Sequence, residues 1–418
     1  MKESDTAEKD RANPRARIAS SNLSLTLVVL ALGWVMIYAD RLSISPLMNM
    51  IRSEFGLSLG ATSFVYSVYF AAYVGFTIPA TIAAAKFGYK KVMVLFMILA
   101  AAALALAGVA GFVFSLLVFF IGLHGVGAGA YYPTTYTIST DLVPKSKRGL
   151  ASSVINSGMG FGTILGLVVS GPVLFYFSNW QVILLILSVP TILVAILLHR
   201  FVPNPNQSSR LASASNSFVA NQYKQVLKDR NFIAISGVMF CSLYGYWVIL
   251  TWAPTFLQDH LHLGISPSGE VTAVFAAVAI PASILISRYS DRVGRKKIAL
   301  AILPLAALTL FFMAYSSDLI EFLAATIFYG VIGKLTLDPI AIAWIQDVVP
   351  RNLIGPSLAL LNVVAMSSSI FATLATGLIA DLTGDLSGGF YLGAAIVLLG
   401  ALFVAFSKSG PLPTKALG

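Results

Sequence analysis

Twelve long apolar runs constrain the fold of this chain of 418 residues more than any other feature of its sequence. A helix needs about 20 apolar residues to cross a bilayer, and each run is close to that length or longer. The runs predict membrane-spanning helices over residues 22–46, 61–84, 92–110, 113–139, 150–171, 180–199, 231–257, 270–287, 298–315, 319–343, 354–380 and 388–407. We therefore expect an all-α integral membrane protein that is embedded in a lipid bilayer.

The composition disfavours several other classes of protein. Hydrophobic residues make up 57% of the chain and charged residues 11%, whereas a soluble domain carries about 25% charged residues. A soluble enzyme, a disordered regulator and a nucleic-acid-binding protein are therefore not expected, although the net charge is +10. The sequence shows no catalytic or metal-ligand constellation and no phosphate-binding loop. We expect no enzymatic activity, no cofactor and no metal site.

The basic residues predict the orientation of the chain in the membrane. Of the 27 Lys and Arg residues, 24 lie in the two tails and in alternate loops, so they share one side. Basic loops remain in the cytoplasm, and an even number of spans places both termini there. The first 21 residues lack the short apolar core of a secretory signal, so we expect the first span to stay as an anchor. The expected location is the cytoplasmic (inner) membrane.

The sequence contains an internal repeat with an offset of 206 residues. The segment Lys86–Val92 (KFGYKKV) returns as Arg292–Ile298 (RVGRKKI), and Asp141–Pro144 (DLVP) returns as Asp347–Pro350 (DVVP). Two halves of the same topology are typical of carriers that work by alternating access. The predicted divisions are a tail over 1–21, a six-helix bundle over 22–199, a linker over 200–230, a second six-helix bundle over 231–407 and a tail over 408–418.

The motif after the eighth span resembles the loop motif of the major facilitator superfamily. Asp291-Arg292-Val-Gly-Arg295-Lys-Lys matches the second half of the chain well, whereas Thr81 and Ala85 replace the glycine and the aspartate of the motif in the first half. The resemblance implies two pseudo-symmetric six-helix bundles. It also implies that Asp291, with Arg292 and Arg295, holds the cytoplasmic side shut. The alternative is that these basic residues only determine the topology.

Within this superfamily, two segments look like the anion:cation symporter family. They are Tyr38-Ala-Asp40-Arg41, late in the first predicted span, and Tyr246–Pro254 in the seventh. Members of that family carry organic anions, such as sugar acids, together with protons or sodium. The fourth span departs from the family pattern, because Phe120 and Gly127 stand where an arginine and a glutamate are usual. Proton coupling by that glutamate therefore cannot be carried over.

Asp40 and Arg41 are ionisable residues inside a predicted span, which makes them functional candidates. The guanidinium group of Arg41 can hold a carboxylate with two hydrogen bonds. Neighbouring residues on a helix do not face one another, so each needs a partner elsewhere. We expect Arg41 to bind substrate and Asp40 to take part in proton coupling. The alternative is that both side chains reach the outer interface or pair with other helices.

Three further ionisable residues lie inside predicted spans. His124, in the fourth span, titrates near neutrality when unperturbed and is a second candidate for proton coupling, or else a structural residue. Lys334 and Asp338 have the spacing of an ion pair within one helix, and Pro339 should loosen that helix. They form either a salt bridge that stabilises a kink, or a second anion site at Lys334 with Asp338 in the proton path. Two cations in one cavity would favour a dicarboxylate.

Aromatic and amide side chains complete the predicted site. The resemblance favours Tyr38 and Tyr73 as substrate contacts, and Trp247 can stack on or hydrogen-bond to a substrate. Asn156 and Asn362 occupy equivalent places in the two halves, and a buried amide needs partners that substrate can supply. Packing between helices is the alternative for all of them.

We interpret the sequence as a secondary active transporter of a small organic anion, either a sugar acid or a mono- or dicarboxylate. The expected mechanism is symport with a proton by alternating access, with sodium as the other candidate ion, in a monomer. A proton-coupled exporter of drugs or metabolites, and a ligand sensor on the same scaffold that transports nothing, remain alternatives.

Overall fold

The computed structural model describes residues 14–144, 148–204, 222–350 and 353–407, and the secondary structure assigned in these ranges is helical. Twelve helical spans in them are long and apolar enough to cross a membrane, which confirms the predicted class of fold. The helices of the first half are α2 (Pro14–Leu42), η1 (Ser45–Leu47), α3 (Met48–Phe55), α4 (Leu59–Phe87), α5 (Tyr89–Ala110), α6 (Phe114–Gly129), α7 (Tyr131–Leu142), α8 (Arg148–Phe177) and α9 (Gln181–Phe201). Those of the second half are α11 (Arg230–His260), α12 (Ile265–Val293), α13 (Arg295–Tyr315), α14 (Leu319–Ile332), α15 (Lys334–Val348), α16 (Ile354–Thr383) and α17 (Ser387–Phe406).

The outward faces of these helices are apolar. Phe119, Leu285 and Phe328 are 61%, 66% and 58% exposed, although a water-soluble fold would bury such side chains. In a bilayer their neighbours are lipid chains, and helices are formed because every backbone amide must find its partner within the chain.

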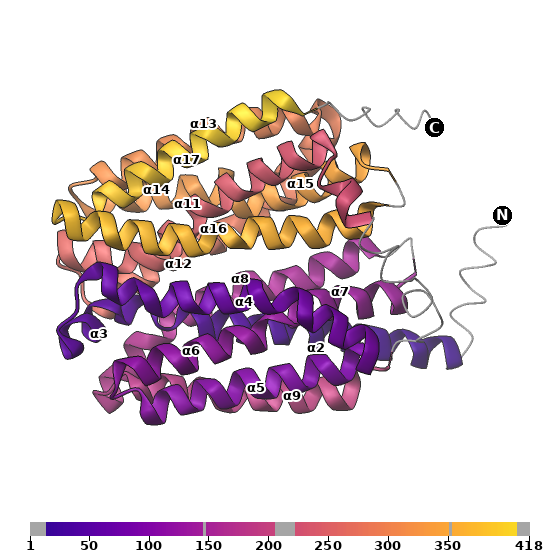
Figure 1. Cartoon of the computed structure of the whole chain (residues 1–418), viewed down its shortest axis with the longest axis horizontal. Coiled ribbons are helices and arrows are strands. Elements are labelled where there is room, and N and C mark those ends of the chain that lie inside the picture. Colours follow the sequence, from indigo (N-terminus) through magenta and orange to yellow (C-terminus); the bar gives the residue numbers. More distant parts are fainter. Residues whose placement is uncertain (1–13, 145–147, 205–221, 351–352, 408–418) are drawn as a thin grey trace.

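The two halves form two bundles of helices that pack side by side (Figure 1). Helix α12 has the bounds of α4, and α16 has the bounds of α8, shifted by 206 residues in each case. Gly88 and Gly294, which follow α4 and α12, have φ of 102° and 103°. Only glycine adopts such angles without strain. The sequence repeat therefore reflects a repeated structure, down to the turn between the second and third span of each half.

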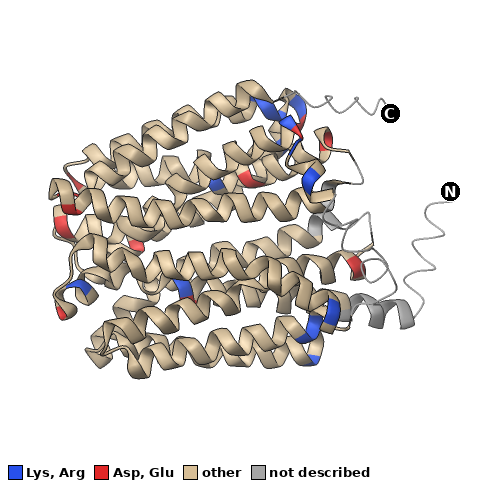
Figure 2. Ribbon diagram, in the orientation of Figure 1, with Lys and Arg blue, Asp and Glu red and all other residues tan. Residues whose placement is uncertain are grey.

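Both described ends of the chain lie at one end of the bundle, which we call the terminal end (Figure 1). Lys and Arg residues gather there, apart from a few inside the bundle and at the other end (Figure 2). Helix α3 and the turns before α4 and α12 lie at the other end, which we call the distal end.

The first membrane span is longer than predicted. Residues 22–46 were expected to cross the membrane, but the helical span runs from Leu23 to Phe55 because η1 and α3 continue it. The length of the apolar run did not predict this extension, because α3 contains polar residues such as Arg52 and Glu54. Arg41 therefore lies near the middle of the span rather than late in it.

The fourth and tenth spans, predicted as single helices, are each divided in two. Helix α14 ends at Gly333, whose N–H donates to the carbonyl of Tyr329 (2.6 Å), and α15 begins at Lys334. Pro339, which was expected to loosen the helix, lies inside α15, and the interruption lies upstream of it. A proline disturbs the turn before it, and the glycine upstream is the residue at which the helix is interrupted.

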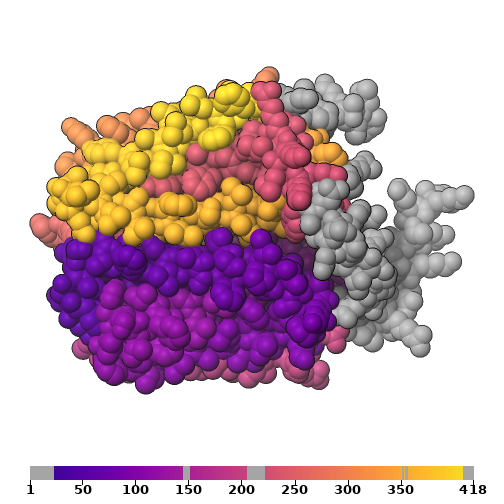
Figure 3. All heavy atoms as spheres, viewed as in Figure 1, coloured from indigo at the N-terminus to yellow at the C-terminus, as the bar shows by residue number. Residues whose placement is uncertain are grey.

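Polar contacts join the two halves at the distal end. Ser45 donates to the carbonyl of Leu250 (2.6 Å), Asn49 donates to Asp259 (2.6 Å), and Asp381 accepts from the hydroxyl of Ser58 (2.7 Å). Asp381 also accepts from the N–H of Gly60 (3.0 Å). Helices α4 and α16 pack along this face of the molecule, where the surfaces of the two halves meet (Figure 3). The distal end is therefore closed by direct contacts between the halves.

Candidate functional site

Arg41 lies at the centre of the candidate site, between the two halves. It is 2% exposed, and its Nε donates to the hydroxyl of Tyr69 (2.8 Å). The aromatic rings around its guanidinium carbon lie at 4.8 Å (Tyr38), 4.8 Å (Tyr69), 5.2 Å (Tyr73), 5.3 Å (Trp247) and 5.4 Å (Phe70). Trp247 comes from the second half and the other rings from the first. The alternative in which Arg41 reaches the outer interface is therefore wrong.

The two terminal nitrogens of Arg41 have no hydrogen-bond partner among the residues that the structure describes. A guanidinium group carries five N–H donors, and buried donors are almost always paired. Among the described residues Nε alone has an acceptor, and electron-rich ring faces surround the rest of the group. The site therefore presents a buried cation with several free donors, which is suited to an anion with two acceptor oxygens.

Asp40 faces another helix, as expected for a neighbour of Arg41. It is fully buried, and its Oδ2 accepts from the hydroxyl of Thr191 in α9 (2.8 Å). Its Oδ1 has no partner within the described chain. The carboxyl group of Asp40 therefore bonds to α9 rather than to the neighbouring Arg41, and one of its oxygens has no partner among the described residues.

His124 lies beneath the ring of Tyr69, with 5.4 Å between the two ring centroids. Its Nδ1 lies 3.0 Å from the carbonyl oxygen of Ala100. A carbonyl can only accept, so Nδ1 carries the hydrogen and Nε2 has a free lone pair. Among the described residues Nε2 has no partner. Tyr69 thus stands between His124 and Arg41.

The second half contributes Lys334 and Asp338, which form an ion pair. Lys334 is 6% exposed, and its Nζ lies 5.1 Å from the centroid of the Tyr246 ring. Lys334 is within electrostatic range of both Tyr38 and Arg41 in the first half. The structure therefore brings the two predicted cations, one from each half, to the same site.

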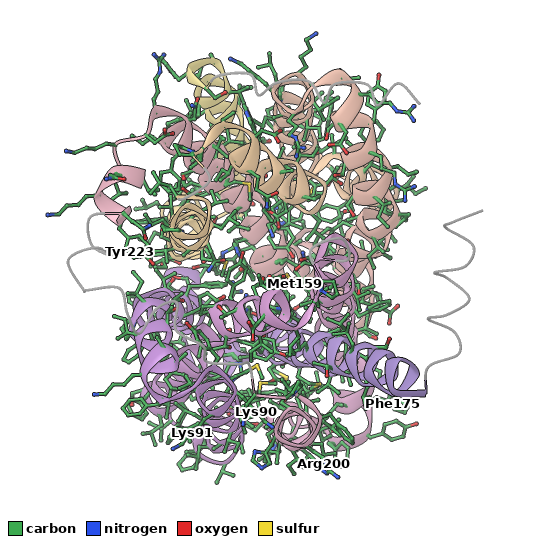
Figure 4. The ribbon with its side chains drawn as sticks, turned by 90° about the vertical axis from the view of Figure 1, so that its right-hand side faces the viewer. Lys90, Lys91, Met159, Phe175, Arg200 and Tyr223 are labelled. Carbon is green, nitrogen blue, oxygen red and sulfur yellow. The ribbon has the colours of Figure 1, made fainter. Side chains whose placement is uncertain are left out.

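The predicted amides lie at the edge of this site. Asn156 accepts a hydrogen bond from the hydroxyl of Tyr136 and remains exposed. Asn362 is partly exposed, and its Nδ2 has no partner within the described residues. Figure 4 shows the molecule from the terminal end, with Met159 of the same helix as Asn156 near the centre and Lys90, Lys91 and Arg200 at the rim. Accessible polar groups thus lie on the helices that lead from the site toward the terminal end.

The predicted gate residues lie at the terminal end of α12 and α13. Arg295 pairs with Asp291 (3.3 Å) and with Asp347 of α15 (2.7 Å), and Arg292 is exposed. All of these residues belong to the second half. The network fastens three helices of that half together, and its role in closing the terminal end remains a prediction.

Several residues of the site were not identified from the sequence. Tyr69 binds the side chain of Arg41, Tyr66 donates to its backbone carbonyl (3.0 Å), Thr191 binds Asp40, and Asp347 binds Arg295. The three-and-four spacing of the tyrosines on α4 gave a signal, as did the repeated DVVP segment that contains Asp347. No sequence pattern identified Thr191 as a partner of Asp40, since the two residues are 151 positions apart. Within the described residues, no three His, Cys, Asp or Glu side chains gather as a metal site would require.

Comparisons with known proteins agree with this architecture. A hexuronate transporter of Bacillus subtilis (strain 168) is 27% identical over 403 residues, which cover 90% of this chain and 93% of that protein. A cis,cis-muconate transport protein of Acinetobacter baylyi is 26% identical over 297 residues, covering 68% and 70% of the two chains. An inward-open structure of the xylose transporter XylE from Escherichia coli has a TM-score of 0.74 at 16% identity and covers 93% of this chain and 97% of that one.

The family model of the Major Facilitator Superfamily matches residues 30–270 and again residues 235–417. The two matches together cover both halves of the chain and include Arg41, Lys334 and the repeated loop motif. Members of this family are transporters rather than enzymes. This chain is a multi-pass membrane protein that belongs to the Major Facilitator Superfamily.

Proposed function

We propose that this protein carries a small organic anion across the membrane by alternating access. The observation that carries the proposal is the buried guanidinium group of Arg41, whose two terminal nitrogens have no partner in the described chain. A buried cation is costly unless an anion pairs with it. The relatives that transport hexuronate, a sugar acid, and cis,cis-muconate, a dicarboxylate, support cargo of this class.

In this proposal a proton moves with the anion. Asp40 and His124 lie on either side of the Arg41–Tyr69 hydrogen bond, and each has a free acceptor atom. Ionisable groups buried in membrane helices commonly serve as proton relays. Tyr38, Tyr73 and Trp247 would form the walls of the substrate site, and Asn156 and Asn362 would line its approach.

The terminal end would face the cytoplasm, because loops rich in Lys and Arg remain on that side. The contacts of Ser45, Asn49 and Asp381 then close the outer side, and the accessible polar groups face inward. Rocking of the two halves would break these contacts and form others at the terminal end, where Asp291 and Arg295 lie.

The test is uptake by purified protein in proteoliposomes, with a panel of labelled sugar acids, dicarboxylates and aromatic acids. We expect uptake of at least one organic anion and faster accumulation when the outside is acidified. A sodium gradient without a pH gradient separates the two coupling ions. An Arg41→Gln variant should transport none of the panel, whereas binding without any flux in the wild type would overturn the proposal.

A further inference from the structure

The two cations of the site belong to different halves of the molecule. Arg41 is at the centre of the first span, and Lys334 is the first residue of α15 in the tenth. They are 2% and 6% exposed, and two adjacent rings connect them. The Nζ of Lys334 lies 5.1 Å from the ring of Tyr246, and that ring lies 5.4 Å from the ring of Trp247. The ring of Trp247 lies 5.3 Å from the guanidinium carbon of Arg41. Like charges that share a site of low dielectric repel. Asp338 neutralises Lys334 here, whereas the terminal nitrogens of Arg41 have no partner among the described residues, so an anion that bound both cations would take the place of Asp338.

The order of Lys334 and Asp338 on their helix argues against a purely structural salt bridge. Lys334 is the first residue of α15, whose N-terminus disfavours a cation, and it lies two residues after the end of α14, whose C-terminus favours one, so the helix dipoles give the pair no clear advantage. The order Lys-then-Asp at this spacing is the weaker orientation for an ion pair within a helix. Interchanging Lys334 and Asp338 would serve a stabilising pair better. The order in this chain instead places the lysine at the break between α14 and α15, with its Nζ against the ring of Tyr246.

The side chain of Asp338 is more exposed than that of Lys334, and one of its oxygens lacks a hydrogen-bond partner among the described residues. Its side chain is 26% exposed, against 7% for that of Lys334, and its Oδ1 has no partner among the described residues. An anion that reached Lys334 would therefore compete with one hydrogen-bonded carboxylate oxygen and would leave Asp338 with access to water.

We propose that Lys334 is a second anion-binding group and that the cargo is a dianion, with one charged group on Arg41 and the other on Lys334 in place of Asp338. This inference rests on the proposed function, and it narrows the class of substrate from organic anions in general to dianions. Because the two cations belong to different halves, one cargo molecule of this class joins the halves across the site. A monoanion would engage one half strongly and leave the Lys334–Asp338 pair in place.

Matched pairs of ligands test the inference. We would titrate the full-length protein in detergent with succinate, tartrate, galactarate and cis,cis-muconate, and with the monoamide of each, while monitoring its thermal stability. Each monoamide keeps the size and one carboxylate of its parent acid. At least one diacid should bind about 10- to 100-fold more tightly than its monoamide, the range expected for one charge-assisted hydrogen bond.

The preference for a diacid over its monoamide should be lost when Lys334 is replaced and should increase when Asp338 is replaced. Lys334→Gln should remove the preference for the diacid and keep the affinity for the monoamide, whereas Lys334→Arg should retain the preference. Asp338→Asn should tighten binding of the diacid, because the competing carboxylate is gone. Lys91→Gln, which removes the same charge at the rim (Figure 4), should change neither affinity.

The outcomes separate this inference from the proposed function. The inference would be overturned if organic monoanions bind through Arg41 as tightly as diacids do and Lys334→Gln has no effect. The proposal of anion transport would not be affected by that result. If Lys334→Gln and Asp338→Asn each weaken binding of the diacid and of its monoamide to the same extent, the ion pair has a structural role. That result would also overturn the inference. If no member of this panel or of the wider panel of organic acids binds, the proposed function itself fails.

Discussion

At the scale of single residues, the question is how a permanent cation is tolerated inside a membrane bundle. The rings around Arg41 can each contribute about 0.5–2 kcal/mol to holding a guanidinium group, and Tyr69 satisfies one of its donors. The remaining donors are unpaired within the described protein. The rings therefore fix the position of the guanidinium group and leave its terminal N–H donors without partners among the described residues. A group that binds an anion needs such free donors.

Asp40 provides a prediction at this scale. Asp40→Asn keeps an acceptor for the hydroxyl of Thr191 but cannot exchange a proton. We expect the variant to retain exchange of labelled for unlabelled anion in proteoliposomes, and to lose at least about tenfold of the accumulation that a pH gradient drives. Thr191→Ser, which preserves the hydroxyl group, is the matched control and should accumulate substrate as the wild type does. Normal pH-driven accumulation by Asp40→Asn would remove Asp40 from the proton path.

At the scale of elements, the paired turns after α4 and α12 define the repeat. Gly88 and Gly294 share an unusual backbone conformation, and both connect a long helix to the next one without an intervening loop. Since each turn joins the second and third spans of its half, the geometry of these two residues fixes how those helices pack.

A glycine substitution tests this role. Gly294→Ala places a side chain at φ of 103°, which should lower the free energy of unfolding by about 1 kcal/mol or more. Gly75→Ala makes the same chemical change inside α4, where an added Cβ would meet no atom within 4 Å. That control should not destabilise the protein. Thermal unfolding in detergent measures both variants, and equal melting temperatures for Gly294→Ala and the wild type would contradict the assignment.

The sequence predicted the elements better than it predicted their interruptions. Apolar length and the alternation of basic loops identified twelve spans, because the bilayer imposes both features on any chain that crosses it. The extension of the first span through α3 was missed because α3 is polar, and the break at Gly333 was not predicted, since only a loosening of the helix at Pro339 was expected. The partners of Arg41 and Asp40 depend on how helices pack against one another, which no local pattern in the sequence specifies.

At the scale of the whole molecule, hydrogen bonds join the two halves at the distal end, while the partly or fully exposed Asn156 and Asn362 lie on helices that run toward the terminal end. This asymmetry is expected of one of the two states of an alternating-access carrier. Asp381 contributes strongly to it, because it accepts two hydrogen bonds from the turn that begins α4.

Weakening this closure should shift the balance between the states. Asp381→Ala removes two hydrogen bonds, each worth about 0.5–1.5 kcal/mol, so the distal end should open more often by roughly 5- to 100-fold. In a Cys241→Ser background, a cysteine placed at the buried Ser45 would report this opening through its rate of labelling by a membrane-impermeant maleimide. Asp318→Ala is the control, since Asp318 caps α14 within one half. An unchanged labelling rate in Asp381→Ala would show that these contacts do not govern closure.

The central claim is that Arg41 binds the anionic cargo directly. Isothermal titration calorimetry of the wild type, Arg41→Lys and Arg41→Gln, with the anion that the wild type transports best, tests it without requiring transport. We expect Arg41→Gln to lose about 10- to 100-fold in affinity. Arg41→Lys keeps the charge but not the planar pair of donors, so its affinity should lie between those of Arg41→Gln and the wild type. Equal affinities in all three proteins would contradict the claim.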